Sequence, residues 1–374
     1  MKKTKAPLLI IAAGGTGGHI YPAQALIEEL LKNNWRVKVF TDKRGFKYFE
    51  EIEQQVELSI ISSAALNGSN IIKKISATLK LLKGTCVAGF YIIRDRPKII
   101  VGFGGYPAFP TMLAAILLRV KLIIHEQNRV LGRVNQIFAT KASVLAYGIW
   151  PTKLLNNTNG IDCGNPVRKS ILNLENSPYI PPGDYPLSIL VLGGSQGSKI
   201  LSEVVPSALA LLPEKIAKHL RVTHQARVED LEQVEEFYQK SGIDSDVRTF
   251  FVDIPRRINE AQLIISRAGA STIAEISVIG RPSILIPLKI AIRDEQTKNA
   301  LSLAQAEAAI ILSEDELTSL KLKETIYELV INPERASRMA EAAYAISKPN
   351  ASIKLMEIVE SVRNNSNKEL KSAK

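Results

Sequence analysis

The chain has 374 residues, of which 46% are hydrophobic and 23% are charged, and its formal net charge is +11. This composition excludes a disordered chain, and the length predicts two globular domains, since it is more than twice that of a usual domain. The positive charge favours an anionic partner such as a membrane surface, although a solvated basic surface explains it equally well; we expect no nucleic acid partner.

The cysteine content and the apolar segments exclude further classes. The two cysteines, Cys86 and Cys163, are far apart and lack metal-ligand spacing, which fits a reducing compartment. No run of about 18 uninterrupted apolar residues occurs, so we expect no membrane-spanning segment. Residues 1–5 lead directly into a short apolar run, and we expect no secretory signal there.

Short apolar runs alternate with helical patterns in the first half of the chain. We expect strands at residues 8–11, 37–40, 99–101 and 122–124, and helices near residues 22–31 and 111–118. This alternation predicts βαβ units, in which a parallel sheet is covered by helices on both faces.

The alternation is interrupted and then restarts. Residues 173–186 are rich in Pro, Asn and Gly, which is typical of a linker. After them we expect strands at residues 188–192, 263–265 and 283–286, and helices at residues 199–211 and 272–279. The sequence therefore predicts an α/β protein with two Rossmann-like parallel-sheet domains that face each other across a cleft.

We place the domain boundaries at these changes in composition. The predicted parts are an N-terminal domain over residues 1–165, a linker over 166–186, a C-terminal domain over 187–348, and a terminal helix with a frayed tail over 349–374.

Glycine-rich turns follow four of the predicted strands. They lie at residues 14–18, 102–105, 193–197 and near residue 269. Glycine permits a sharp turn and close approach to a ligand, and the helix that follows offers N–H groups to phosphate or sugar oxygens. Because ligands of open α/β sheets bind at the carboxyl ends of the strands, we expect the four turns to belong to one site.

These turns differ from the standard nucleotide motifs. Residues 15–20 lack the third glycine of the dinucleotide fingerprint, although Asp42 follows the second strand, where a ribose-binding acid would be expected. Residues 193–199 lack the Lys-Ser or Lys-Thr that closes a Walker loop. An NAD enzyme is therefore the least favoured alternative, and a phosphate-handling turn is favoured over a purely structural one.

The four histidines fall into different settings. His19 directly follows the first glycine turn, so we expect it to act as a catalyst or to contact substrate. His125 is expected to end a buried strand, with Glu126 and Asn128 facing the cleft. A structural role is favoured for His219 and His224.

The second half carries its own candidate site. Ser271 and Thr272 are expected to cap a helix whose N–H groups suit a diphosphate. Glu275, one turn further on, can accept both hydroxyls of a ribose, or it can simply interact favourably with the helix dipole. The polar residues 293–299 suit hydrogen bonds to a sugar or, equally, a solvated helix start.

Residues 70–98 combine apolar and basic side chains. Isoleucines, leucines and aromatic residues alternate with lysines and end at Arg94 and Arg96. This pattern is typical of a helix in a membrane interface, to which anionic lipids add roughly 1 kcal/mol per nearby basic residue. A core helix with one solvated face is the alternative that stays open.

As a set, these motifs resemble the MurG family of glycosyltransferase family 28. The matching motifs, in family order over residues 8–300, are Gly14-Gly15-Thr16-Gly17-Gly18-His19-Ile20-Tyr21-Pro22, Gly102-Phe103-Gly104-Gly105-Tyr106, His125-Glu126-Gln127-Asn128, Gly164-Asn165-Pro166-Val167-Arg168, Gly193-Gly194-Ser195-Gln196-Gly197, Arg267-Ala268-Gly269-Ala270-Ser271-Thr272-Ile273-Ala274-Glu275 and Asp294-Glu295-Gln296-Thr297-Lys298-Asn299-Ala300.

The resemblance implies a fold, a reaction and a location. The fold is the two-domain GT-B fold. The reaction is the inverting transfer of N-acetylglucosamine from UDP-N-acetylglucosamine to the 4-hydroxyl of the muramyl sugar of lipid I, which forms lipid II in peptidoglycan synthesis. The implied location is the cytoplasmic face of the plasma membrane, with peripheral attachment.

The resemblance also implies roles for individual residues. Inversion needs a base for the acceptor hydroxyl and stabilisation of the departing UDP; His19 is the first candidate base and Glu126 the second. The implied donor contacts are Thr16, Gly17, Gly18, Asn128, Arg168, Ser195, Val252 through its backbone at the uracil, Ala270, Ser271, Thr272, Ile273, Ala274, Glu275 and Gln296. The implied contacts to the acceptor diphosphate are Gly104, Gly105 and Tyr106.

We expect neither a metal nor a cofactor, because helix ends would neutralise the diphosphate. One position departs from the family pattern: Glu295-Gln296 stands where two neighbouring glutamines are expected, and an ionised Glu295 can only accept hydrogen bonds.

Two other functions stay open on a similar scaffold. A UDP-N-acetylglucosamine 2-epimerase would turn over the donor without an acceptor. A non-catalytic module would bind a nucleotide sugar without turnover, although His19 and Glu126 argue against it.

Overall fold

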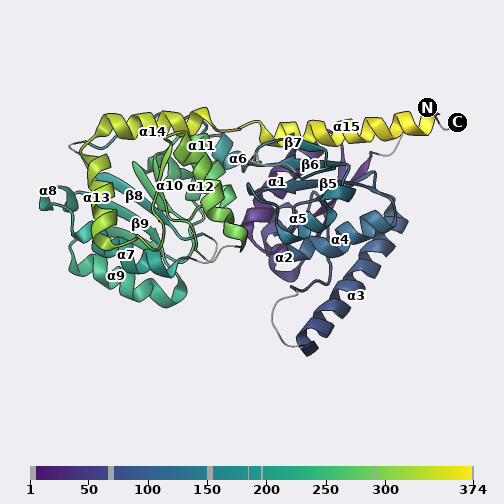
Figure 1. Cartoon of the computed structure of the whole chain (residues 1–374), viewed down its shortest axis with the longest axis horizontal. Coiled ribbons are helices and arrows are strands. Elements are labelled where there is room, and N and C mark those ends of the chain that lie inside the picture. Colours follow the sequence, from purple (N-terminus) through teal and green to yellow (C-terminus); the bar gives the residue numbers. More distant parts are fainter. Residues whose placement is uncertain are drawn as a thin grey trace. The chain divides into compact units, whose positions relative to one another are not determined.

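A computed structural model describes residues 6–65, 71–149, 155–183, 185–194, 197–289 and 292–372. The chain divides into two compact units, one formed by Met1–Arg168 with Pro349–Lys374 and the other by Lys169–Lys348. Each unit is built around one parallel sheet with helices on both faces (Figure 1). The predicted α/β class with two parallel-sheet domains is confirmed.

The first unit contains a seven-stranded parallel sheet. Its strands are β1 (Leu8–Ala12), β2 (Arg36–Thr41), β3 (Glu57–Ile60), β4 (Ile99–Gly102), β5 (Lys121–Glu126), β6 (Val144–Tyr147) and β7 (Gly160–Asp162). The strand order is β3-β2-β1-β4-β5-β6-β7, so the direction of winding reverses between β1 and β4. The turns that follow these two strands therefore meet at the topological switch point, where open α/β sheets bind ligands.

Helices cover both faces of this sheet. They are α1 (Gly17–Lys32), α2 (Lys43–Phe49), α3 (Ile71–Asp95), α4 (Gly105–Leu117), α5 (Arg133–Phe138) and α15 (Ala351–Ser372). Because side chains alternate along a strand, Leu9 and Ile11 pack in one core with α1 and α15, whereas Ile10 and Ala12 pack in another with α3 and α4. Figure 1 shows α15, in yellow, running beside α1.

The second unit contains a six-stranded parallel sheet with the order β10-β9-β8-β11-β12-β13. Its strands are β8 (Leu187–Leu192), β9 (Leu220–Gln225), β10 (Asp244–Arg248), β11 (Leu263–Ser266), β12 (Ser283–Leu285) and β13 (Ala309–Ile311). Its helices are α6 (Lys169–Leu172), α7 (Lys199–Ala210), α8 (Glu214–Ala217), α9 (Leu231–Lys240), α10 (Ile254–Glu260), α11 (Ala270–Ile279), α12 (Glu295–Gln305), α13 (Ser319–Val330) and α14 (Pro333–Ala345). Winding reverses between β8 and β11, which places their turns at the second switch point.

The structure corrects two helix starts. α1 begins at Gly17 rather than near residue 22, because Thr16 is its N-cap and the glycines form its first turn. α4 begins at Gly105 rather than residue 111, after Gly104 with φ +86°. Both helices therefore start directly at a glycine turn.

The segment predicted as a linker is divided between the units, and the C-terminal helix belongs to the first unit. Residues 166–168 belong to the first unit and residues 169–186 to the second, and α15 returns to the core of the first unit. Of the helices in the described residues, none combines the length and apolarity that crossing a membrane requires.

Candidate active site

The first glycine turn is fixed by a carboxylate from the neighbouring strand. Gly15 adopts φ +86°, and its N–H donates to Asp42 Oδ1 at 3.0 Å. The same oxygen accepts the N–H of Gly45 at 3.0 Å, which caps α2. Asp42 therefore holds the turn from within the protein, and its carboxylate no longer supports the alternative of a dinucleotide site.

The N-terminus of α1 gathers three of the predicted donor contacts. Thr16 is the N-cap residue; its side chain is exposed and makes no capping hydrogen bond. Gly17 is buried, and a Cβ there would lie 2.8 Å from the Tyr21 ring. Gly18 is half-buried. With no acidic residue in its first turn, this helix end suits an anionic or sugar oxygen.

His19 lies between the two glycine turns of the first unit. The imidazole is half-buried, and its Nδ1 is 2.9 Å from Gln127 Oε1. On the other edge, a Cβ at Gly105 would lie 3.2 Å from His19 Nε2. The structure thus brings the first candidate base next to the turn that the sequence assigns to the acceptor.

The second glycine turn, to which the family resemblance assigns the acceptor, has little space for side chains. Gly104 and Gly105 have φ of +86° and +71°, and a Cβ at Gly104 would lie 2.8 Å from Asn135 Nδ2. Tyr106 follows, and its hydroxyl accepts a hydrogen bond from Arg44 and lies 3.4 Å from Asp42 Oδ2. Asp42 therefore connects both turns.

Glu126, which we expected to face the cleft, is buried. Its side chain is 1% exposed, and its carboxylate accepts four hydrogen bonds. Oε1 accepts from the backbone and side-chain nitrogens of Asn128, both at 3.1 Å, and Oε2 from Gly132 N at 2.7 Å and Asn135 Nδ2 at 2.9 Å. Both oxygens hold the loop after β5, so this geometry favours His19 over Glu126 as the base.

Arg168 is the last residue of the first unit before the chain enters the second unit, and its side chain lies against α1. Its guanidinium carbon is 4.3 Å from the centroid of the Tyr21 ring, within the range of a cation–π contact. Tyr21 is two residues after His19, in the first turns of α1. Arg168 therefore lies at the same edge of the sheet as the candidate base.

In the second unit, Arg267 fixes the turns at the switch point. Its Nε donates to Ser198 Oγ at 3.0 Å, and its Nη1 donates to the Ile286 carbonyl at 3.1 Å. An ion pair of 2.5 Å joins its Nη2 to Glu314. Sequence reasoning gave this buried arginine no role; Ser195 in the same turn lies outside the described residues.

α11 begins as an uncapped helix end. Its N-cap is Gly269, with φ −69° and ψ 139°, so the expected capping by Ser271 and Thr272 is wrong. Both residues are half-buried in the first turn, as is Ala274 further on, whereas Ala270, Ile273 and Glu275 are buried. The first turn contains no acidic residue, and it therefore suits a diphosphate.

Gln296 connects the ends of two strands. Its Oε1 accepts the N–H of Ala268 at 3.3 Å and that of Leu288 at 3.0 Å. Both bonds use the oxygen, so the side-chain NH₂ group is the part that can donate to a sugar. Glu295, the departure from the family pattern, is the first residue of α12.

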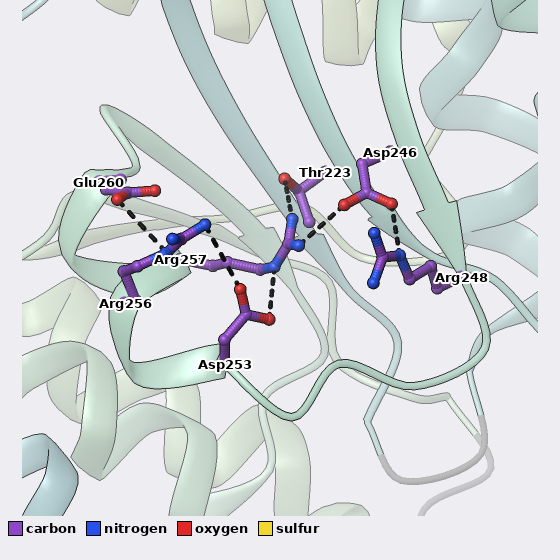
Figure 2. Close-up of polar contacts among 7 residues, drawn as sticks. All are labelled: Thr223, Asp246, Arg248, Asp253, Arg256, Arg257 and Glu260. Atoms are coloured by element: carbon purple, nitrogen blue, oxygen red, sulfur yellow. Dashed lines mark hydrogen bonds and ion pairs between the residues drawn. The ribbon is translucent and has the colours of Figure 1, made fainter.

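Val252 lies on an exposed loop that an arginine cluster supports. The residue is 85% exposed, between β10 and α10. Figure 2 shows Arg257 reaching from α10 to Asp253, Asp246 and Thr223, at 2.8, 2.8 and 3.1 Å. The hydrogen bond from Arg257 lowers the pKa of Asp253 below its usual value.

The same arginine also stacks on the loop. Its guanidinium carbon lies 4.2 Å from the ring centroid of Phe251, the residue before Val252. Sequence reasoning missed this cluster; the four-residue spacing of Asp253 and Arg257 was the only local signal for it.

Comparisons with known proteins show the family to which the chain belongs. The profile of the glycosyltransferase family 28 N-terminal domain matches residues 9–146, and that of the C-terminal domain matches residues 188–356. The chain is 41% identical over 358 residues to the UDP-N-acetylglucosamine–N-acetylmuramyl-(pentapeptide) pyrophosphoryl-undecaprenol N-acetylglucosamine transferase of Caulobacter vibrioides, covering 94% of this chain and 98% of the relative. The chain belongs to this family of glycosyltransferase family 28 enzymes.

Solved structures place the family 28 chain among GT-B glycosyltransferases. The crystal structure of Acinetobacter baumannii MurG is similar with a TM-score of 0.74 and 30% identity, over 95% of this chain and 99% of that one. A protein described as a UDP-N-acetylglucosamine 2-epimerase from Listeria monocytogenes has a TM-score of 0.67 with 14% identity, over 96% of each chain. The second likeness shows a shared fold alone, so the sequence relationship favours the transferase over the epimerase.

The family 28 chain also exposes an apolar and basic surface on α3. We call it the α3 surface. Its exposed apolar members are Ile71, Ile72, Ile75, Leu79, Leu82, Phe90 and Ile93, and its lysines are Lys73, Lys74, Lys80 and Lys83. The alternative of a core helix applies only to the opposite side, where Ala77, Leu81, Ala88 and Ile92 are buried.

The two histidines of the second unit differ in their surroundings. His224 is buried, and its Nδ1 is 2.9 Å from the Tyr238 hydroxyl; burial lowers its pKa to about 3. His219 is exposed. Within the described ranges, no group of three or more His, Cys, Asp or Glu side chains is arranged to hold a metal ion.

Proposed function

We propose that this family 28 transferase moves N-acetylglucosamine from UDP-N-acetylglucosamine to the 4-hydroxyl of the muramyl sugar of lipid I. The observation that carries this proposal is the 41% identity over nearly the full length of a transferase of that name. The switch-point turns of both sheets, each ending in an uncapped helix N-terminus, supply the chemistry that a nucleotide sugar needs.

His19 acts as the general base. Its Nε2 takes the proton of the acceptor hydroxyl while that oxygen bonds to the anomeric carbon; the bond from this carbon to the UDP oxygen breaks, and UDP leaves with its electrons. Attack opposite the leaving group inverts the anomeric centre. Two observations support His19: its Nε2 edge lies beside Gly105, and both oxygens of Glu126 are already engaged.

The nucleotide part of the donor has its own group of contacts. The N-terminus of α11 receives the diphosphate, with Arg168 and Ser195 as further contacts, and Glu275 receives the ribose. The backbone of Val252 faces the uracil.

The sugar is held by a second group of polar contacts. The NH₂ group of Gln296 donates to the N-acetylglucosamine hydroxyls. Thr16, Gly17, Gly18 and Asn128 approach the sugar from the first unit.

The enzyme works at an anionic membrane surface, as a peripheral protein of the cytoplasmic face of the plasma membrane. The α3 surface supports this assignment, because exposed isoleucines beside lysines bind at the boundary between acyl chains and acidic headgroups. A lipid-linked acceptor would be reached from the same surface.

One assay separates the candidate functions. The purified chain is incubated with UDP-N-acetylglucosamine labelled in the sugar, with and without a lipid I analogue. We expect label in a β-linked disaccharide lipid only when the acceptor is present. Conversion of the donor without acceptor would instead support the epimerase, and binding without turnover would support the non-catalytic module.

A further inference from the structure

The buried side chain of Gln127 connects the candidate base to the sheet. Gln127 directly follows β5 and is 2% exposed. Its Oε1 is 2.9 Å from His19 Nδ1. Its Nε2 is 3.1 Å from the Phe103 carbonyl oxygen, 3.1 Å from His125 Nδ1 and 3.2 Å from the His125 carbonyl oxygen. One amide therefore bridges α1, the turn after β4, and the end of β5.

The surroundings determine which end of this amide faces His19. Carbonyl oxygens can only accept hydrogen bonds, so the end of Gln127 that faces two of them must be the NH₂ group. The reverse orientation would place oxygen against oxygen at 3.1 and 3.2 Å in a buried site. Oε1 thus faces His19, and an oxygen acceptor requires a hydrogen on His19 Nδ1.

His125 supports the same orientation independently. Its ring is fully buried, and its Nε2 is 3.0 Å from the carbonyl oxygen of Gly164, which requires a hydrogen on Nε2. Burial lowers the pKa of His125 to about 4, so the ring is neutral near pH 7 and its Nδ1 has no hydrogen. That nitrogen needs a donor, and the NH₂ group of Gln127 is in place to supply it.

We propose that Gln127, itself oriented by His125, holds neutral His19 as the Nδ1–H tautomer with the lone pair on Nε2. Nε2 is the nitrogen beside Gly105, at the start of the acceptor turn. Gln127 and His125 are positioning residues that never touch the reacting atoms. This inference rests on the proposed role of His19 as the base.

The choice of an amide partner has a chemical consequence. A carboxylate at this position would fix the same tautomer but would also favour the imidazolium form, which cannot accept a proton. An amide oxygen fixes the tautomer without adding negative charge.

The tautomer can be measured directly on the full chain without substrate. The four histidines are labelled with ¹⁵N, and two-bond ¹H–¹⁵N correlation spectra are recorded near neutral pH. Comparison with His19→Asn assigns the His19 signals. We expect a protonated Nδ1 and an unprotonated Nε2; a neutral His19 protonated on Nε2 would overturn the proposal.

One variant and a control extend the test. Gln127→Leu removes the acceptor, so His19 should lose the pure Nδ1–H pattern and kcat should fall at least about tenfold while the Kd for UDP-N-acetylglucosamine is unchanged. The wild-type spectrum alone keeps the test decisive if Gln127→Leu does not fold. Gln24→Leu, on the same helix α1, should change neither readout. A wild-type tautomer pattern in Gln127→Leu would contradict the proposal.

The spectra also separate this inference from the function on which it rests. Wild-type His19 with the expected tautomer but no transfer to lipid I would contradict the function and support the positioning. Transfer with the opposite tautomer would do the reverse.

Discussion

The backbone N–H of Gly15 donates to Asp42 Oδ1 over 3.0 Å, and through this bond the end of β2 determines the shape of the turn after β1. The same oxygen caps α2 through Gly45. The carboxylate of Asp42, at the end of the neighbouring strand, thus organises the turn.

Removing this acceptor should destabilise the first unit. We expect Asp42→Ala to lower the free energy of unfolding by about 1–3 kcal/mol, because it removes a helix cap and leaves the N–H of Gly15 without its partner. Urea unfolding measures the change. Asp42→Asn keeps an oxygen acceptor and should retain most of the stability; equal losses in the two variants would show that hydrogen bonding to Oδ1 is not the cause.

Arg257 should influence donor affinity without touching the donor. We expect Arg257→Lys to weaken UDP binding about tenfold, or 1.4 kcal/mol, because an ammonium cannot bridge Asp246, Asp253 and Thr223 and the loop that carries Val252 loses its support. Titration calorimetry with UDP measures the affinity. Arg338→Lys, on α14 of the same unit and 67% exposed, is the matched control and should bind UDP normally. Unchanged affinity in Arg257→Lys would remove this loop from the uracil site.

Much of the fold could be predicted from the sequence because buried parallel strands appear as short apolar runs. β1, β8 and β11 are such runs, and each is followed by glycine at a sharp turn. The edge strands β3 and β10 were not predicted. Their side chains are half-buried or exposed, and β10 is the polar segment Asp244–Arg248, so neither has the apolar pattern of a central strand.

The site could be predicted only where it is local. The turn that carries Thr16 and His19 was evident because glycines and a histidine are neighbours in the chain. Gln127 is 108 residues from His19, and only the neighbouring ends of β1, β4 and β5 bring the two together. Asp42 was considered as a ribose contact and Glu126 as the second candidate base, because the sequence cannot show that their oxygens are already engaged by backbone N–H groups.

Acid should destabilise both units through buried histidines. The pKa values of His125 and His224 are lowered by burial to about 4 and about 3, whereas an unfolded histidine titrates near 6.5. Below pH ~6.5 the unfolded chain therefore binds protons that the folded chain does not, and each histidine lowers the free energy of unfolding by up to about 1.4 kcal/mol per pH unit until its folded pKa is reached.

The effect of one histidine can be isolated by difference. Urea unfolding of the wild type and of His224→Gln is compared between about pH 7.5 and about pH 5. The wild-type transition should lose more stability over this interval than the variant does. Equal pH dependence in both proteins would mean that His224 is not buried in its neutral form.

The lysines of the α3 surface should control membrane binding. Lys73, Lys74, Lys80 and Lys83 are changed together to glutamine, and sedimentation is measured with vesicles of phosphatidylglycerol. We expect binding to weaken by at least about tenfold, since each basic residue contributes roughly 1 kcal/mol at an anionic surface. The wild-type binding should also decrease as salt is added.

A matched variant controls for the loss of charge. Lys215, Lys218, Lys240 and Lys321 are exposed lysines of the second unit, and changing them to glutamine alters the net charge equally. This variant should bind vesicles like the wild type. Equal weakening in both variants would indicate a general charge effect and would contradict a specific role for α3.

The single-turnover rate of His19→Ala tests most directly whether His19 is the general base. Enzyme in excess is mixed with labelled UDP-N-acetylglucosamine and a lipid I analogue, and donor affinity is measured separately. If His19 is the base, the rate of transfer falls by about 10²- to 10⁴-fold while the Kd of the donor stays within about twofold. Transfer at the wild-type rate by His19→Ala would contradict a role of His19 as the base.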